Sequence, residues 1–541
     1  MAASVKMPEE QLKPALSKQS TQEHIQESSA NGMEDSEPGD EPTLAEINRI
    51  YRKLDWRIIP PFWVLYFLCA SIRSTVGLSQ TMNIAEKHDL GSVLQMTPHE
   101  ISTSLALFYV CYVVFDLPSN LIMTRLSPRV WMSRIVIGVG VIGSCMAAAK
   151  AAWSLYLLRL LLGVVMAGLW PGMAYYLTLF YPPSRTGKRI GFYFTAAQVS
   201  AAVVGLVSAG FQKMDDERGI VGFRWMFLIY GICGTATGIS LLWWLPERPL
   251  PPGESPSPRS KVSRWLPQTP PALTGRDAEV HYRDLKRIYH RTQWTLSDLG
   301  RVLMDWRIWP LLIMYFGVVG VGIGVQSYGT VIIRATNPKL TGVELSLLFA
   351  PIWITDLLSI LLITPLSDRF HHHRALFFSL PATLQILGLL LTTYAGNPST
   401  NPWPRYAGLL IVGFGLGPTV PVTMTWTNEV FQPRHGEVGV AAASAVVSGL
   451  GNLGSIVSTY ALYAGWESDR LASGASQYRK SNWVMIGMLV GSILAAVVME
   501  VLLRVVDGKK GGAEVDGDGA ARRESRQRGL EGVWFLKWKK K

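Results

Sequence analysis

Residues 58–79 read IIPPFWVLYFLCASIRSTVGLS, an apolar run of 22 residues with a single charged side chain, Arg73. A run of this length can cross the hydrocarbon core of a bilayer as a helix. An arginine at the centre of such a helix is unfavourable by about 2.5–3.5 kcal/mol on insertion scales, so it normally faces the interior of a helix bundle. The run therefore predicts a membrane helix whose arginine faces a central cavity.

Apolar runs of similar length recur along the chain, which has 541 residues, 49% of them hydrophobic and only 17% charged. An average soluble domain carries about 25% charged residues. This composition excludes a large soluble enzyme. The sequence contains no ATP-binding loop, which argues against a primary pump, and no nucleophile–base pair stands out, so we expect no enzymatic activity and no cofactor. We expect an all-α membrane protein with twelve transmembrane helices, at 58–79, 101–123, 131–150, 153–181, 189–211, 223–245, 308–334, 343–366, 375–395, 404–430, 438–464 and 482–503.

Positive charges gather in alternate loops between these runs. Loop 124–134 holds Arg125, Arg129 and Arg134 without an acid, whereas loop 212–222 contains three acids. By the positive-inside rule, both termini and the central linker are cytoplasmic. The net charge of +12 therefore reflects topology, and we expect no nucleic-acid partner. The expected domains are a disordered N-tail at 1–55, a six-helix bundle at 56–245, a linker with a short helix at 246–306, a second six-helix bundle at 307–503 and a basic C-tail at 504–541.

The two halves contain a similar loop after their second apolar run. The first half has TRLSPRVWMSR at 124–134, and the second half has PLSDRFHHHRALF at 365–377. Two sets of six helices around a cytoplasmic linker are similar to the parallel repeats of the major facilitator superfamily. Asp368, Arg369 and Arg374 resemble its loop motif, which implies a gating charge network; the alternative is an ordinary positive-inside loop. Three adjacent histidines, 371–373, diverge on a helical turn, so we expect no metal site.

Longer stretches resemble one family within that superfamily. KLDWRIIP (53–60), LFYVCYVVFDLPSNLIMTRLSPRVWM (107–132) and RLLLGVVMAGLWPGMAYYLTLFYP (159–182) are similar to the anion:cation symporter family. The long linker and tails resemble its fungal allantoate-permease branch. This resemblance implies import of a small organic anion, such as allantoate, a vitamin carboxylate or a sulfur-containing acid.

Two arginines are candidates for binding such an anion. Arg73 lies in the first predicted span and Arg159 in the outer part of the fourth. A guanidinium group offers a planar, permanently charged fork that matches a carboxylate. The resemblance implies an arginine at each position around the substrate. The alternatives are that Arg159 extends to the outer surface and that Arg73 pairs with a buried acid.

The sequence departs from the family pattern at the acids linked to proton coupling. Ile72 stands where the family usually has aspartate, and Met166 stands where it usually has glutamate. A carboxyl group near an arginine can exchange a proton for an ion pair, which links protonation to substrate binding. The chain keeps the cationic half of this arrangement and lacks both usual acids.

Two other acids lie within predicted spans. Asp356 falls close to the middle of the membrane, and we expect it to be the counter-charge of the arginines or a substitute proton site. The alternative is a structural aspartate held by hydrogen bonds. Asp116 lies at the inner end of the second span, where we expect a structural contact near the cytoplasmic gate.

Polar side chains inside the spans are candidates for selecting the substrate. Gln198, Gln326 and Tyr328 can contact the substrate or bond to a neighbouring helix. Asn452 lies in GLGNLG, where helix packing is the favoured interpretation, and Trp170 and Trp426 can stack on a ring.

The sequence therefore predicts a transporter that imports a small organic anion by alternating access, with protons as the expected coupling ion. An exporter, a facilitator and a non-transporting nutrient sensor remain as alternatives. We expect a monomer in the plasma membrane, with the basic C-terminal tail WFLKWKKK (534–541) close to anionic lipid.

Overall fold

The computed structural model describes residues 42–249, 271–288, 296–370, 373–396, 401–472 and 476–513. Much of the predicted N-tail, linker and C-tail lies outside the described residues, as do His371 and His372. The chain divides into two compact units, Met1–Arg52 and Lys53–Lys541. Within the first unit, the described residues are helical from Leu44 onward. The architecture below is that of the second unit.

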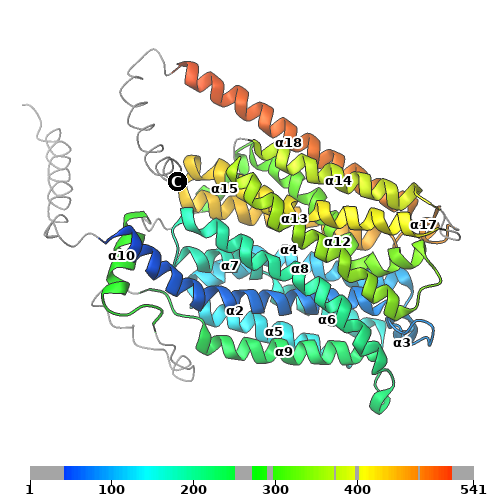
Figure 1. Ribbon diagram of the computed structural model, residues 1–541. Helices are drawn as coiled ribbons and strands as arrows, with labels where there is room; N and C mark the ends of the chain where they lie inside the picture. The colour runs from blue at the N-terminus through cyan, green and yellow to red at the C-terminus, as the bar shows by residue number, and fades with distance from the viewer. Residues whose placement is uncertain are drawn as a thin grey trace, which may run out of the picture. The chain divides into compact units, whose positions relative to one another are not determined.

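Long helices make up most of the second unit (Figure 1). The first half holds α2 (Leu44–Ser79), α4 (Pro98–Arg125), α5 (Pro128–Met146), α6 (Ala152–Met166), α7 (Leu169–Thr178), α8 (Pro183–Lys213) and α9 (Gly222–Trp244). The second half holds α12 (Ile308–Thr336), α13 (Gly342–Arg369), α14 (Arg374–Tyr394), α15 (Trp403–Gly451) and α18 (Arg479–Ala513). Short segments are α3 (Leu90–Leu94), η2 (Glu217–Gly219), α10 (Arg276–Ile288), α11 (Leu296–Met304), α16 (Leu453–Ile456), η5 (Val457–Ala461) and α17 (Glu467–Arg470). The all-helical fold predicted from the apolar runs is confirmed.

Ten helices in the described part of the chain are long and apolar enough to cross a membrane. Two further spans were predicted. The span 101–123 corresponds to α4, and the span 438–464 corresponds to the end of α15 together with α16 and η5. The predicted span 153–181 is divided into α6 and α7 at Gly168, whose φ of 81° lies in the left-handed region that glycine adopts without strain. An apolar run predicts the depth of a segment in the membrane, but it does not reveal such a break.

Helix α15 continues through residues 431–437, which the sequence placed between two spans, although its membrane-spanning part, Trp403–Phe431, agrees with the predicted span 404–430. The chain nevertheless reverses inside this element. Ser444 Oγ donates a hydrogen bond of 2.8 Å to Asn428 Oδ1. In a straight helix, residues sixteen apart are separated by about 24 Å along the axis. The bond therefore requires two antiparallel segments joined by a turn that keeps helical geometry. The predicted spans 404–430 and 438–464 are likewise antiparallel.

The second long helix of each half begins with the same capping box. Thr97 caps α4 and Thr341 caps α13, and each hydroxyl accepts the backbone N–H of a glutamate three residues later. The glutamates return the bond, with Glu100 Oε2 at 2.7 Å from Thr97 N and Glu344 Oε2 at 2.8 Å from Thr341 N. These reciprocal bonds satisfy amide groups that a helix start leaves free. They are a second signature of the internal repeat, in addition to the arginine-rich loops.

Small residues allow α5 and α9 to pack backbone against backbone. A methyl group built on Gly231 of α9 would overlap the amide nitrogen and hydroxyl of Ser144 and would lie 2.7 Å from the carbonyl oxygen of Gly140. A methyl group built on Gly210, near the end of α8, would meet no atom within 4 Å. The two glycines therefore differ in their tolerance of a larger residue.

We expect Gly231→Ala to lower the melting temperature of the detergent-solubilised protein by about 2–4 °C, because overpacking costs about 1–3 kcal/mol. The matched variant Gly210→Ala should leave the melting temperature unchanged. Intrinsic fluorescence during a temperature ramp measures both. Equal melting temperatures for the two variants would contradict the close contact between α5 and α9.

The described part of the linker contains α10 and α11, where the sequence predicted one helix near the membrane face. Lys53 Nζ of α2 lies 2.5 Å from Asp277 Oδ2 of α10. His281 Nε2 lies 2.7 Å from the carbonyl oxygen of Phe180, and because a carbonyl only accepts, this nitrogen carries the proton. Burial lowers the pKa of His281. These contacts connect α10 to α2 and to the segment that follows α7.

Candidate functional site

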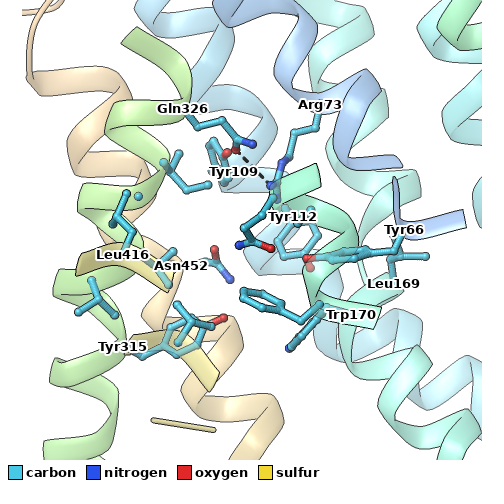
Figure 2. Close-up of a pocket in the computed structure, with 18 of the residues that line it drawn as sticks. Tyr66, Arg73, Tyr109, Tyr112, Leu169, Trp170, Tyr315, Gln326, Leu416 and Asn452 are labelled. Atoms are coloured by element: carbon cyan, nitrogen blue, oxygen red, sulfur yellow. Dashed lines mark hydrogen bonds between the residues drawn. The ribbon is translucent and has the colours of Figure 1, made fainter. Parts of the chain in front are cut away.

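A cavity of about 120 Å³ lies between helices of the two halves. Arg73 and Asp356 are the only residues of charged type among the described residues that line it. Aromatic residues form a large part of the wall, namely Tyr66, Phe108, Tyr109, Tyr112, Trp170, Phe194, Tyr315 and Trp353. Figure 2 shows Tyr66, Tyr112, Leu169 and Trp170 on one side and Tyr315, Leu416 and Asn452 on the other.

Arg73 enters the cavity from α2 and meets Gln326 of α12. Its Nη2 donates a hydrogen bond of 3.2 Å to Gln326 Oε1, which is the dashed line in Figure 2. Its Nε is buried without a hydrogen-bond partner. No ion pair of Arg73 occurs among the described residues. The guanidinium group therefore keeps donors available for a ligand and has no carboxylate in contact to neutralise it.

Asp356 reaches the same cavity from α13. Its side chain is buried, Gln198 of α8 lines the same cavity, and Asp356 Oδ1 has no hydrogen-bond partner. A methyl group built on Gly417 of α15 would lie 2.6 Å from Asp356 Oδ1, so glycine is required there for the aspartate to fit. The cavity thus holds one guanidinium group and one carboxyl group, both with unused hydrogen-bonding capacity.

Arg159 and Tyr328 do not line the cavity, although the sequence placed both in the substrate site. Arg159 is 1% exposed, and its Nη1 lies 3.5 Å from the backbone carbonyl of Arg73. It packs behind α2, with its guanidinium carbon 5.1 Å from the centre of the Phe108 ring. Tyr328 is bonded on both sides, accepting from Ser102 Oγ at 2.9 Å and donating to the carbonyl of Thr459 at 2.7 Å.

The two positions that lack the usual acids have different surroundings. Met166 lines the cavity. Ile72 is buried away from it, against Gly143 of α5 and Gly234 of α9. Among the other polar candidates, Gln198, Gln326 and Asn452 line the cavity, as does Trp170, whereas Trp426 is absent from its wall. Asn452 lies at the break between α15 and α16 and donates to the carbonyl of Ser448 at 2.7 Å.

Charged groups at the predicted cytoplasmic ends form networks within each half. Arg374 binds Glu429 through two bonds of 3.0 and 2.6 Å and binds Asp368 at 3.0 Å. Arg369 is exposed at the end of α13.

In the first half, Arg129 Nη2 lies 2.7 Å from Glu247 Oε1. Asp116 Oδ1 accepts the backbone N–H of Gly168 at 2.9 Å, beside the break between α6 and α7.

Sequence reasoning missed two parts of this arrangement. Glu429 was not identified as the partner of Arg374, although it lies in the WTNEV segment of α15. The tyrosines around Arg73 were also missed. Tyr66 precedes Arg73 by seven residues, and Tyr109 and Tyr112 are three residues apart, so helical spacing places each set on one face. That spacing was the available signal.

Comparisons with known proteins agree with the architecture. The sequence profile of the Major Facilitator Superfamily matches residues 62–459. "Vitamin H transporter 1" of Schizosaccharomyces pombe is 44% identical over 500 residues, covering 89% of this chain and 86% of that protein. A "putative tartrate transporter" of Agrobacterium vitis is 25% identical over 456 residues, covering 83% and 91%. The solved structure of a bacterial homologue of the human lysosomal transporter Spinster, inward-facing and unoccupied, has a TM-score of 0.57 at 15% identity, covering 86% and 98%.

Proposed function

Because the chain belongs to the major facilitator superfamily, we propose that it imports a small organic carboxylate of the vitamin class, with vitamin H (biotin) as the first candidate. It is a multi-pass membrane protein and a secondary transporter, not an enzyme. The finer assignment to the fungal allantoate-permease branch of the anion:cation symporters is part of the proposal, as is a location in the plasma membrane. Alternating access between two six-helix bundles is the mechanism that this assignment implies.

The observation that carries the proposal is the unpaired guanidinium group of Arg73 in the cavity. No carboxylate contacts this buried guanidinium group, and an anion that enters the cavity supplies a directly bonded partner for it. The planar fork of arginine suits a carboxylate, which can accept two parallel hydrogen bonds. The hydrogen bond from Nη2 to Gln326 Oε1 keeps the group oriented within the cavity.

The aromatic wall supports a substrate that also has an apolar body. Apart from Arg73, Asp356 and three carboxamides, the lining consists of aromatic, aliphatic and glycine residues and Met166. Ligand sites of this type bury most of a small molecule and fix its orientation with a few polar groups. Biotin fits this description, since it has one carboxylate, an apolar chain and a compact ring system. The 44% identity to a protein named for vitamin H transport supports it as the first substrate to test.

We further propose that protons are the coupling ion and that Asp356 carries the proton. With Arg73 charged and Asp356 ionised, the empty cavity is electrically neutral. Adding only the anion, or only a proton, leaves a net charge in a region of low dielectric constant. Adding both restores neutrality, so each favours binding of the other. Met166 cannot take part, and the absence of the usual acid there keeps a facilitator as the second candidate.

Uptake in a yeast strain that lacks its own biotin importer tests the proposal. We expect saturable uptake of radiolabelled biotin that is faster at about pH 4.5 than at about pH 7 and is lost with a protonophore, because proton and anion bind together. Surface expression is verified with an epitope tag, and cells with empty vector provide the background. Nicotinate, pantothenate, allantoate and tartrate are then added as competitors.

The outcomes separate the parts of the proposal. Uptake of another of these acids, measured directly with its own radiolabel, without biotin uptake would keep the carboxylate class and replace biotin as the first candidate. Biotin uptake that ignores pH and protonophore would favour the facilitator. A protein that reaches the surface and transports none of these acids would contradict the import of vitamin-class carboxylates.

A further inference from the structure

The two halves meet in a seam at one end of the cavity. Gln80 Nε2, just after α2, donates to the carbonyl of Ser327 of α12 at 3.0 Å, and Ser102 of α4 bonds to Tyr328 of α12 at 2.9 Å. Gly77 is so close to α12 that a methyl group there would lie 3.0 Å from the carbonyl of Gln326. Under the predicted topology, this end faces outside the cell. No charged side chain takes part in these bonds.

Gln212 of α8 connects three elements of this seam. Its Nε2 donates to Ser346 Oγ at 2.9 Å and to the carbonyl of Gly342 at 3.3 Å, both on α13 of the other half. Its Oε1 accepts the backbone N–H of Asn83 at 3.3 Å, and its backbone carbonyl accepts from Asn83 Nδ2 at 3.1 Å. The side chain is buried, with 4% of its surface exposed. A single carboxamide therefore bonds the loop after α2 to the start of α13.

The start of α13 is shaped for this contact. A methyl group built on Gly342 would lie 2.5 Å from Gln212 Oε1 and 2.8 Å from the carbonyl oxygen of Thr81. The capping box of Thr341 and Glu344 fixes the first turn of α13 in place. The carbonyl of Gly342 and the hydroxyl of Ser346 are thus presented to Gln212 by a preformed helix start.

We propose that Gln212 is the positioning residue that holds the outer entrance shut and so sets the fraction of the protein that opens to the outside. The bonds from Gln212 to α13 join the two halves, so they exist only while the outer ends are together. Water can replace them when the halves separate, and within the described part of the chain no ion pair joins the two halves at this end. The seam is therefore a weak closure that substrate binding can release, and this inference does not depend on which substrate is carried.

Cysteine labelling from outside the cell measures the open fraction directly. Cys69, Cys111, Cys145 and Cys233 are replaced by alanine, and Gly322→Cys is the reporter. Gly322 lines the cavity, and a methyl group built there meets only Leu416 Cδ2, at 3.5 Å. A membrane-impermeant maleimide added to intact cells reaches this position only through an open outer entrance.

We expect Gln212→Met to increase the outside labelling rate about tenfold, the shift that corresponds to about 1.4 kcal/mol. Labelling from the cytosolic side, measured on inside-out vesicles, should fall. Gln385→Met is the matched control, because Gln385 is also buried but bonds to the carbonyl of Gly415 within its own half, at 2.9 Å. It should leave both rates unchanged.

Ser346→Ala removes one acceptor of Gln212 with a smaller change in volume, and we expect about a threefold increase in outside labelling. Its matched control on the same helix is Ser359→Ala, since Ser359 Oγ is buried without a partner. If Gln212→Met fails to reach the membrane, the comparison between the two serine variants decides. Equal labelling rates for Gln212→Met and its parent, or equal increases in a variant and its control, would overturn the inference.

Discussion

Replacement of Arg73 by glutamine is expected to reduce uptake at low substrate concentration at least about thirtyfold, because loss of one partner of a desolvated charge pair costs about 2–5 kcal/mol. Glutamine keeps hydrogen-bond donors but removes the charge that neutralises the anion. Arg73→Lys should retain part of the activity, about one tenth, because a lysine supplies the charge without the planar fork. Initial rates of radiolabelled biotin uptake, corrected for surface expression, measure both effects.

The control for this prediction is Arg134→Gln. Arg134 is an exposed arginine of α5 whose guanidinium carbon lies 3.7 Å from the centre of the Trp131 ring, away from the cavity. Its loss changes the net charge of the first half by the same amount as the loss of Arg73. We expect normal uptake from this variant. If Arg73→Gln transported with the affinity of the parent, the assignment of Arg73 to the substrate would have to be abandoned.

Asp356→Asn is expected to uncouple transport from protons while leaving the substrate site intact. Asparagine has the shape of aspartate and keeps a polar side chain in the cavity that Gln198 also lines. It cannot release or accept the proton that balances the anion. We expect the ratio of uptake at about pH 4.5 to uptake at about pH 7 to fall from roughly ten to about one. Accumulation against a gradient should disappear, while exchange of internal for external substrate continues.

Two measurements distinguish this result from a loss of structure. Exchange across the membrane requires a working site and alternating access, so an unfolded variant would lose it. Glu500→Gln is the matched control, because Glu500 is a membrane-helix carboxylate of α18 that pairs with Arg504 at 2.7 Å, remote from the cavity. It should keep the pH dependence of the parent. Unchanged pH dependence in Asp356→Asn would place the coupling proton elsewhere.

The sequence was informative about the helices and less so about their continuity. The predicted spans 343–366 and 375–395 lie within a few residues of α13 and α14. The helical geometry through 431–437 was not predicted. Apolar length reports the energy of moving a segment from water into lipid. It carries no information on where backbone hydrogen bonds continue, because that depends on local turns and on neighbouring helices.

What the sequence alone determined is the presence of Arg73 and Asp356 at membrane depth and hence their exclusion from lipid. The free-energy cost of placing a charged side chain in lipid is set by the residue type. An arginine or aspartate inside an apolar run therefore indicates exclusion from lipid without knowledge of the fold. The tertiary structure decided that both line one cavity and that Arg159 packs behind Arg73. It also decided the partners of Gln212, which belong to the other half of the chain. Contacts of this kind depend on which helix faces meet, and helix packing brings together residues that hydropathy treats as independent.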